Sequence, residues 1–229
     1  MAYAIGDIHG CLNTLQDLIR QIPRDEELVF LGDYVDRGPD SYGVIKFLEE
    51  LARDRPCYFI MGNHELMMKR AIDDREQIPF WLLNGGENTL NSYQISSNEW
   101  KQLPDRGSPL GNFLRFYDTL SYYHEDENSI YVHAGIDLNI DEMSKQDPEV
   151  LLWIRDRSFQ NASNWKGKQV VFGHTPTQSM GLSHGKVFQS HGFFGIDTGC
   201  VYDGMLTAIN TKTHEILQSP LLDTLTRPW

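Results

Sequence analysis

The chain has 229 residues, of which 40% are hydrophobic and 23% are charged, a composition that excludes wholesale disorder and favours one domain with a buried core. Its 20 Lys and Arg residues against 32 Asp and Glu residues give a net charge of -12, which excludes bulk nucleic-acid binding through a broad basic surface. Three cysteines without metal-type spacing, and no leader-like or membrane-length apolar run, lead us to expect a cytoplasmic protein without disulfides or a membrane partner.

The first third of the sequence alternates short apolar runs with helical patterns. The apolar runs are bounded by glycine-containing turns and predict buried parallel strands over residues 2–5, 28–31 and 57–61. Apolar residues spaced three and four apart predict helices over residues 12–22 and 44–52, and a third helix is expected to begin near Glu65. Right-handed crossovers between these strands bring the loops that follow them to one edge of the sheet.

Residues 76–125 are less regular, and we expect them to form a helical cap inserted into a single domain that spans residues 1–229. Within this insertion, "NGGEN" predicts a turn and residues 109–119 predict a helix. From Ser129 onward, six short runs predict strands: "SIYVHAG", "QVVFGH", "KVFQ", "FFGIDTG", "MLTAIN" and "HEILQS". An α/β opening followed by a strand-rich second half predicts two sheets packed face to face, with helices outside.

Five of the expected strands are followed by polar or charged side chains, and each of these strand ends includes a group that could bind a metal ion, at the edge where α/β sheets bind ligands. These are Asp7 and His9 in "GDIHG", Asp33, Asp36 and Arg37 in "GDYVDRG", Asn63, His64 and Glu65 in "GNHE", His133 in "YVHAG", and His174 in "VFGHTP". Each one alone is more often a helix cap, a turn residue or a core histidine. Together at one buried edge they would stay unpaired or repel each other unless a cation neutralised them.

The types of side chain narrow the expected cofactor. Mixed Asp, His and Asn ligands without thiolate suit manganese, iron or zinc better than they suit calcium or a structural zinc site. The set is too large for one ion, so we expect two divalent ions, with manganese as the first choice, as in sites of in-line phosphoryl displacement.

These motifs closely resemble the phosphoprotein phosphatase branch of the calcineurin-like metallophosphoesterases, over residues 5–204. The resemblance implies a four-layer α-β-β-α sandwich of two mixed sheets. It also implies that Asp7 and His9 hold one metal ion, that Asn63, His133 and His174 hold the second, and that Asp33 bridges both.

The expected reaction is direct attack on phosphorus by a hydroxide that bridges the two ions. His64 is the expected general acid, because an imidazole pKa lies near the working pH, and the resemblance implies that Asp36 is its partner. Arg37 is expected to bind the phosphate oxygens as a planar fork. The resemblance implies a second arginine clamp, for which we choose Arg155 over Arg157, and Glu65 is interpreted as first-turn helix stabilisation.

The main functional hypothesis is a metal-dependent phosphatase acting on phosphoserine, phosphothreonine and small phosphomonoesters. An alternative with the same dinuclear chemistry is hydrolysis of dinucleoside polyphosphates such as diadenosine tetraphosphate, because enzymes of that kind share these motifs, including "IDTGC". A catalytically inactive binding scaffold is a third hypothesis, and the complete ligand set together with His64 argues against it.

Overall fold

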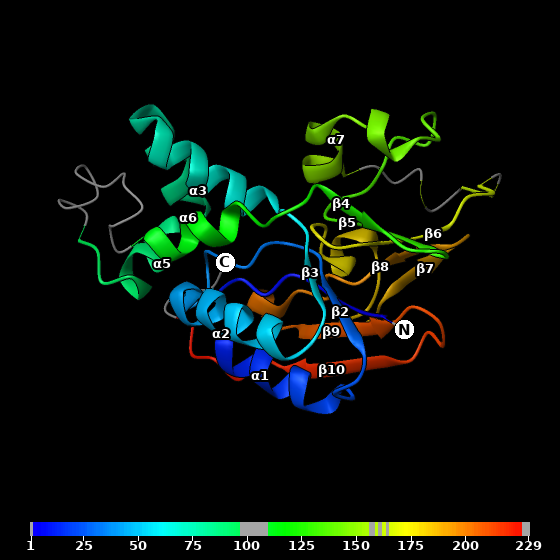
Figure 1. Ribbon diagram of the computed structural model, residues 1–229, viewed down its shortest axis with the longest axis horizontal. Coiled ribbons are helices and arrows are strands. Elements are labelled where there is room, and N and C mark those ends of the chain that lie inside the picture. The colour runs from blue at the N-terminus through cyan, green and yellow to red at the C-terminus, as the bar shows by residue number, and fades with distance from the viewer. Residues whose placement is uncertain (1, 97–109, 156–158, 160–161, 164, 226–229) are drawn as a thin grey trace.

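Two five-stranded sheets stack face to face, and helices cover their outer faces, in a computed structural model that describes residues 2–96, 110–155, 159, 162, 163 and 165–225 (Figure 1). This arrangement confirms the expected α/β class and the two mixed sheets of the metallophosphoesterase fold. The strands are β1 (Ala2–Ile5), β2 (Glu27–Phe30), β3 (Cys57–Phe59), β4 (Tyr123–Glu125), β5 (Ser129–Val132), β6 (Gln169–Phe172), β7 (Phe188–Ser190), β8 (Phe193–Gly195), β9 (Met205–Asn210) and β10 (Ile216–Pro220).

The helices follow the apolar periodicity of the sequence, with boundaries set by capping. The α-helices are α1 (Leu12–Gln21), α2 (Ser41–Asp54), α3 (Asn63–Asp73), α4 (Ile78–Trp81), α5 (Glu87–Ser92), α6 (Gly111–Tyr117) and α7 (Pro148–Trp153). Helix α2 begins earlier than expected because the Asp40 side chain accepts the backbone N–H of Gly43 at 2.8 Å and caps its first turn. Among the helices of the described ranges, none has the length and apolar character needed to cross a membrane.

The first sheet has the order β10-β9-β1-β2-β3. Strands β1, β2 and β3 are parallel, as predicted, while β9 and β10 add to the sheet in antiparallel fashion. The third strand is shorter than expected: Ile60 leaves the ladder and forms an isolated bridge with Ser121. The carboxyl ends of β1, β2 and β3 therefore lie side by side at one edge, and the loops that follow these parallel strands lie at the same edge.

The second sheet has the order β4-β5-β6-β8-β7, with β5, β6 and β8 parallel to one another. All six strands expected after residue 128 are present, four of them (β5 to β8) in this sheet and two (β9 and β10) in the first sheet. The sequence gives no period-2 signal for β4, a three-residue edge strand that pairs antiparallel with β5.

Three apolar clusters fill the three spaces between the four layers. Alternation along β1 illustrates how: Ala2 and Ala4 face the second sheet, whereas Tyr3 and Ile5 face the helices. On the far side, Leu151 of α7 lies in one apolar cluster with Val132 and Val170 of the second sheet. The small alanines of β1 allow the two sheets to approach closely at the centre of the molecule.

Residues 76–125 contain the short helices α4, α5 and α6, and they end in β4. The turn expected over "NGGEN" is present as a kink: the helical stretch Leu82–Gly86 is broken at Gly85, just before α5 begins. Only Gly85 departs from helical dihedrals, with φ of +102°, and a Cβ there would lie 2.8 Å from the backbone nitrogen of Arg37. The predicted helix near residue 109 is α6, although residues 97–109 lie outside the described ranges.

Candidate active site

The loops after five strands bring the expected site residues together at one edge of the two sheets. Asp7 and His9 follow β1, Asp33 follows β2, and Asn63 and His64 begin α3 after β3. His133 follows β5 and His174 follows β6, on the second sheet. The residues therefore come from both sheets, and not from the first sheet alone as expected. The six expected metal ligands and His64 are all buried.

Five of these candidate residues have a left-handed backbone although none is glycine. The φ angles are +46° at His9, +51° at Asp33, +71° at Asp36, +68° at Arg37 and +63° at His174. Such conformations are costly for residues with a Cβ, and they cluster at functional sites where the surrounding fold holds them in place. Five of the nine non-glycine residues with positive φ in the described ranges therefore lie in the loops that carry the polar side chains of the site.

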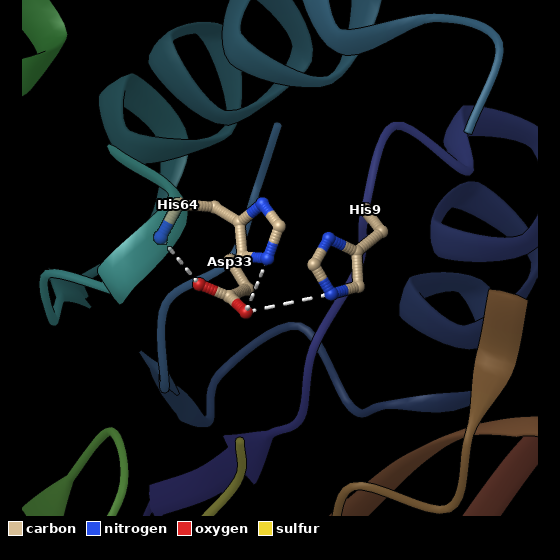
Figure 2. A group of neighbouring side chains, drawn as sticks. All are labelled: His9, Asp33 and His64. Atoms are coloured by element: carbon tan, nitrogen blue, oxygen red, sulfur yellow. Dashed lines mark hydrogen bonds and ion pairs between the residues drawn. The ribbon is translucent and has the colours of Figure 1, made fainter. Parts of the chain in front are cut away.

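One group of potential ligands consists of His9, Asp33 and His64, whose ligating atoms all lie within 4.8 Å of one another. In Figure 2, both imidazoles turn their Nε2 atoms toward the Asp33 carboxylate. The Oδ2 atom of Asp33 is 3.4 Å from His9 Nε2 and 3.9 Å from His64 Nε2. The Nδ1 atom of His9 lies 2.9 Å from the backbone oxygen of Val35, so Nδ1 carries the proton and Nε2 presents a lone pair.

A second group consists of Asp33, His133 and His174, also within 4.8 Å. The other oxygen of Asp33, Oδ1, is 3.4 Å from His133 Nε2. The Oδ1 atom of Asn63 lies between the two histidines, 2.8 Å from His133 Nε2 and 2.9 Å from His174 Nδ1. Asp33 thus directs one oxygen to each group, which is the geometry of a carboxylate shared by two cations.

The hydrogen bonds of His133 test whether a cation fits this position. Its Nδ1 atom donates to the backbone oxygen of Leu31 at 2.8 Å, which leaves Nε2 without a proton in the neutral ring. The lone pair of Nε2 then faces the Asn63 oxygen, another acceptor, at 2.8 Å. Burial lowers the pKa of His133, so a proton is disfavoured as the bridge, whereas a divalent cation satisfies both atoms.

Excess negative charge supports the same conclusion. Burial, followed by the charges of Asp197 and Asp33, raises the pKa of Asp7 well above its ordinary value. Burial alone would raise the pKa of Asp33 as well, but the positive charge that His133 and His64 carry when protonated reverses the effect and lowers it. Asp7 is outside both three-residue groups, and its carboxylate accepts the backbone N–H of His174 at 3.0 Å. The carboxylates and neutral imidazoles at this edge fit divalent metal ions.

Asp36 and His64 form a buried pair beside the first group. Asp36 Oδ2 accepts from His64 Nδ1 at 2.8 Å, and the two side chains are 0% and 1% exposed. This bond holds a proton on Nδ1 and fixes the orientation of the His64 ring, so that its Nε2 atom faces Asp33. Burial lowers the pKa of His64 well below its ordinary value, and the charge of Asp33 opposes this shift.

Arg37 lies beside the first group, next to His9. Its Nη1 atom is 2.7 Å from His9 Nε2, and its guanidinium stands 5.6 Å from the ring centre of Tyr202. The backbone N–H of Arg37 donates to the Gly85 oxygen at 3.2 Å. A guanidinium held at this place can pair with an anionic group that enters the site.

Arg155 follows α7 and is exposed. Its charge lowers the pKa of His133 and His174, in addition to the larger effect of burial, which places it within electrostatic reach of the second group. Arg157, the other arginine considered from the sequence, lies outside the described residues.

Sequence reasoning gave no role at the site to two carboxylates that the structure places there. Glu65 is fully buried and accepts backbone N–H groups from the loop of Asp33, rather than only stabilising the first turn of α3. Asp197 follows β8 and is 6% exposed, and burial raises its pKa to about 6. The strand-end pattern that indicated Asp7 and His133 could have indicated Asp197, because the same edge receives β8.

A comparison with known protein families agrees with this geometry. The calcineurin-like phosphoesterase family matches residues 2–198. The chain belongs to this family. Its members use divalent metals, in agreement with the two ligand groups, so this phosphoesterase is a hydrolase with a candidate metal centre.

The names of curated relatives do not bear out the more specific assignment to the phosphoprotein phosphatase branch. The chain is 27% identical to the bis(5'-nucleosyl)-tetraphosphatase PrpE [asymmetrical] of Halalkalibacterium halodurans, covering 94% of this chain and 92% of the relative. It is also 27% identical to the enzyme of the same name from Oceanobacillus iheyensis, with 93% and 89% covered. These relatives carry the name of the alternative activity.

Solved structures support the fold of this phosphoesterase. A provisionally named diadenosine tetraphosphatase superposes with a TM-score of 0.70 at 23% identity, covering 96% of this chain and 92% of the other. A metallophosphoesterase from Sphaerobacter thermophilus superposes with a TM-score of 0.55 at 16% identity, with 97% and 89% covered.

Proposed function

We propose that this phosphoesterase hydrolyses a phosphoanhydride bond of dinucleoside polyphosphates, with diadenosine tetraphosphate as the reference substrate. The names of the curated relatives support this substrate class over phosphoproteins. The observation that carries the chemistry is the Asp33 carboxylate, whose two oxygens face two separate groups of imidazoles at 3.4 Å.

Six residues would hold two divalent ions, of which manganese is our first choice: Asp7, His9, Asp33, Asn63, His133 and His174. When bound, the ions would supply an activated water as the nucleophile and neutralise the charge of the phosphate. Asp33 would orient this site by placing one oxygen on each side, and Leu31 and Val35 would keep His133 and His9 in the tautomers that present Nε2.

The remaining residues would act on the substrate. Arg37 would pair with non-bridging phosphate oxygens, and Arg155 is the proposed second clamp at the rim. In its doubly protonated form, which the charge of Asp33 favours against the effect of burial, His64 would donate the Nε2 proton to the oxygen that leaves phosphorus, while its Nδ1–H stays bonded to Asp36. The attacking water and the leaving group would occupy opposite sides of the phosphorus, so the His64 side of Asp33 would receive the departing nucleotide.

Three substrates distinguish the candidate reactions: diadenosine tetraphosphate, a phosphoserine peptide and p-nitrophenyl phosphate, each with manganese present. We expect the highest kcat/KM on diadenosine tetraphosphate, with adenosine tri- and monophosphate as products, because the named relatives cleave asymmetrically. A higher kcat/KM on the phosphopeptide would overturn the substrate class in favour of the protein phosphatase hypothesis. Turnover of none of the three would leave only the binding-scaffold hypothesis.

The role of His64 is tested by His64→Asn, with the exposed His184→Asn as a matched control. Removing a general acid is expected to lower kcat by roughly 100-fold or more, while the control retains wild-type kcat. Equal kcat for the His64 variant and the wild type would contradict the assignment of His64 as proton donor.

A further inference from the structure

The carboxylate of Asp36 receives more hydrogen bonds than the one from His64. The indole of Trp81 in α4 donates from Nε1 to Asp36 Oδ2 at 2.9 Å and lies 3.0 Å from Oδ1. The Thr89 hydroxyl in α5 donates to Oδ1 at 2.7 Å. Trp81 and Thr89 are both 0% exposed, so water does not replace these donors. The partner of His64 is therefore held by two side chains from the helical segment 78–92.

The direction of each proton in this network can be assigned. Trp81 Nε1 can only donate, and the Thr89 hydroxyl accepts the backbone N–H of Asp36 at 2.9 Å. The single proton of Thr89 goes to Asp36 Oδ1, so Ser41 donates its own proton to Thr89 Oγ1 at 2.9 Å. Ser41 in turn accepts the backbone N–H of Asp36 at 3.1 Å. Every donor in this network has an acceptor, and the position of the carboxylate is fixed on both oxygens.

We propose that Trp81, with Thr89, is a positioning residue for catalysis: its indole N–H holds the Asp36 carboxylate in the one orientation that orients His64. This inference depends on the proposed role of His64 as proton donor but not on which phosphate compound is the natural substrate. Neither residue belongs to the strand-end motifs. The helices inserted after α3 thus complete the catalytic pair in addition to covering the first sheet.

A change in leaving group separates this role from a general loss of stability. Phenolate is a poor leaving group, since the pKa of its conjugate acid is about 10, and it depends on a donated proton far more than p-nitrophenolate does. Trp81→Phe is expected to lower kcat on phenyl phosphate about tenfold and on p-nitrophenyl phosphate less than about twofold, with KM unchanged. Equal losses on both substrates, or no loss, would overturn the proposal.

Trp165→Phe is the matched control. The Trp165 indole donates to the backbone oxygen of Lys168 at 2.8 Å, and its ring packs against Gly167 as the Trp81 ring packs against Gly86. It lies in the apolar cluster of the second sheet, away from the catalytic pair. This variant loses the same kind of bond and ring volume, and it is expected to keep the wild-type ratio of the two kcat values.

A double-mutant cycle tests whether Trp81 acts through His64. In the His64→Asn background, Trp81→Phe is expected to have no further effect on kcat for phenyl phosphate, because the donated proton is already absent. An additive loss would overturn the proposal. If Trp81→Phe does not fold, Thr89→Val removes the other donor to the same carboxylate, and the same split and the same non-additivity are expected.

An NMR measurement tests the contact without turnover. The indole N–H resonance of Trp81, assigned by its loss in Trp81→Phe, is expected to shift in Asp36→Asn, and an unshifted resonance would overturn the proposal. Turnover of aryl phosphates without cleavage of diadenosine tetraphosphate would overturn the proposed substrate alone. If the wild type hydrolyses neither aryl phosphate and does not cleave diadenosine tetraphosphate, the proposed function and the role of Trp81 both fail.

Discussion

Glu65 accepts the backbone N–H of Tyr34 at 2.8 Å and thereby ties the first turn of α3 to the loop after β2. The same carboxylate accepts the N–H groups of Asp33 at 3.0 Å, Val35 at 3.1 Å and Gly62 at 3.0 Å. Two backbone donors reach each carboxylate oxygen, so Glu65 sets the conformation of the strained segment that presents Asp33 to both groups of histidines.

Substituting Glu65 by Gln would turn an amide NH2 toward two of these buried N–H donors. Because two donors lose their acceptor, we expect the free energy of unfolding to fall by about 2–5 kcal/mol, measured by urea denaturation. Glu149→Gln is the control, since Glu149 is paired with Arg70 at an exposed site and its loss should cost about 0.5 kcal/mol or less. A Glu65 variant as stable as this control would show that the four bonds do not hold the loop.

A residue near the end of the described chain caps the helix that follows the first motif. Helix α1 has no side-chain cap from Cys11 and no acidic residue in its first turn. Asp223 supplies one: it accepts the backbone N–H of Asn13 at 3.1 Å, that of Thr14 at 3.0 Å, and the Thr14 hydroxyl at 2.7 Å.

Asp223→Ala is therefore expected to lower the free energy of unfolding by about 1–3 kcal/mol in urea, since a cap and a buried hydroxyl partner are lost. Asp73→Ala, at an exposed ion pair with Lys69, is the control and should change stability by about 0.5 kcal/mol or less. If the two variants unfold at the same urea concentration, the contact with Asp223 does not stabilise α1.

The pH dependence of thiol labelling tests the environment of Cys57, which is half-buried, whereas Cys11 and Cys200 are buried. Burial raises the pKa of Cys57 to about 11, while Arg55 opposes the shift. Because only the thiolate reacts, the labelling rate should rise about tenfold for each pH unit between pH 7 and 9, with no plateau. Cys57→Ser should abolish this phase, and a plateau below pH 9 would mean that the thiol titrates near its ordinary pKa.

Metal removal should destabilise the wild-type protein. Ions that bind only the folded chain add about 2.7 kcal/mol per site at one hundred times the dissociation constant, which raises the Tm by about 5 °C or more. Manganese should therefore raise the Tm relative to excess EDTA, and Asp33→Ala should reduce this shift because Asp33 faces both groups. The exposed Asp73→Ala is expected to keep the full shift, and identical Tm values for the wild type in manganese and EDTA would speak against metal binding.

Much of the fold could be predicted because local patterns and tertiary packing agree. The apolar runs that became β1 and β2 are buried on both faces, and the loops after them must meet at one edge. Strand β4 was missed because three residues show no apolar period and the strand forms only by pairing with β5. The positive φ of Gly85 depends on its close approach to Arg37, a residue distant in sequence.

For the site, the sequence indicated which side chains gather but not what holds them. The histidines and carboxylates carry a signal because they recur after five strands whose ends meet at the edge where such sheets bind ligands. Trp81, Glu65 and Asp223 act through contacts across 45, 31 and 210 positions, and an isolated Trp, Glu or Asp has an ordinary interpretation at each position. Such supporting contacts follow from the packed structure rather than from periodicity or motif.

The most direct test of the metal centre is anomalous diffraction at the manganese edge from a crystal grown with manganese. The account predicts two peaks roughly 3.5–4 Å apart with Asp33 between them, one beside His9 and the other beside His133 and His174. A single peak, or peaks that do not contact Asp33, would contradict a dinuclear site.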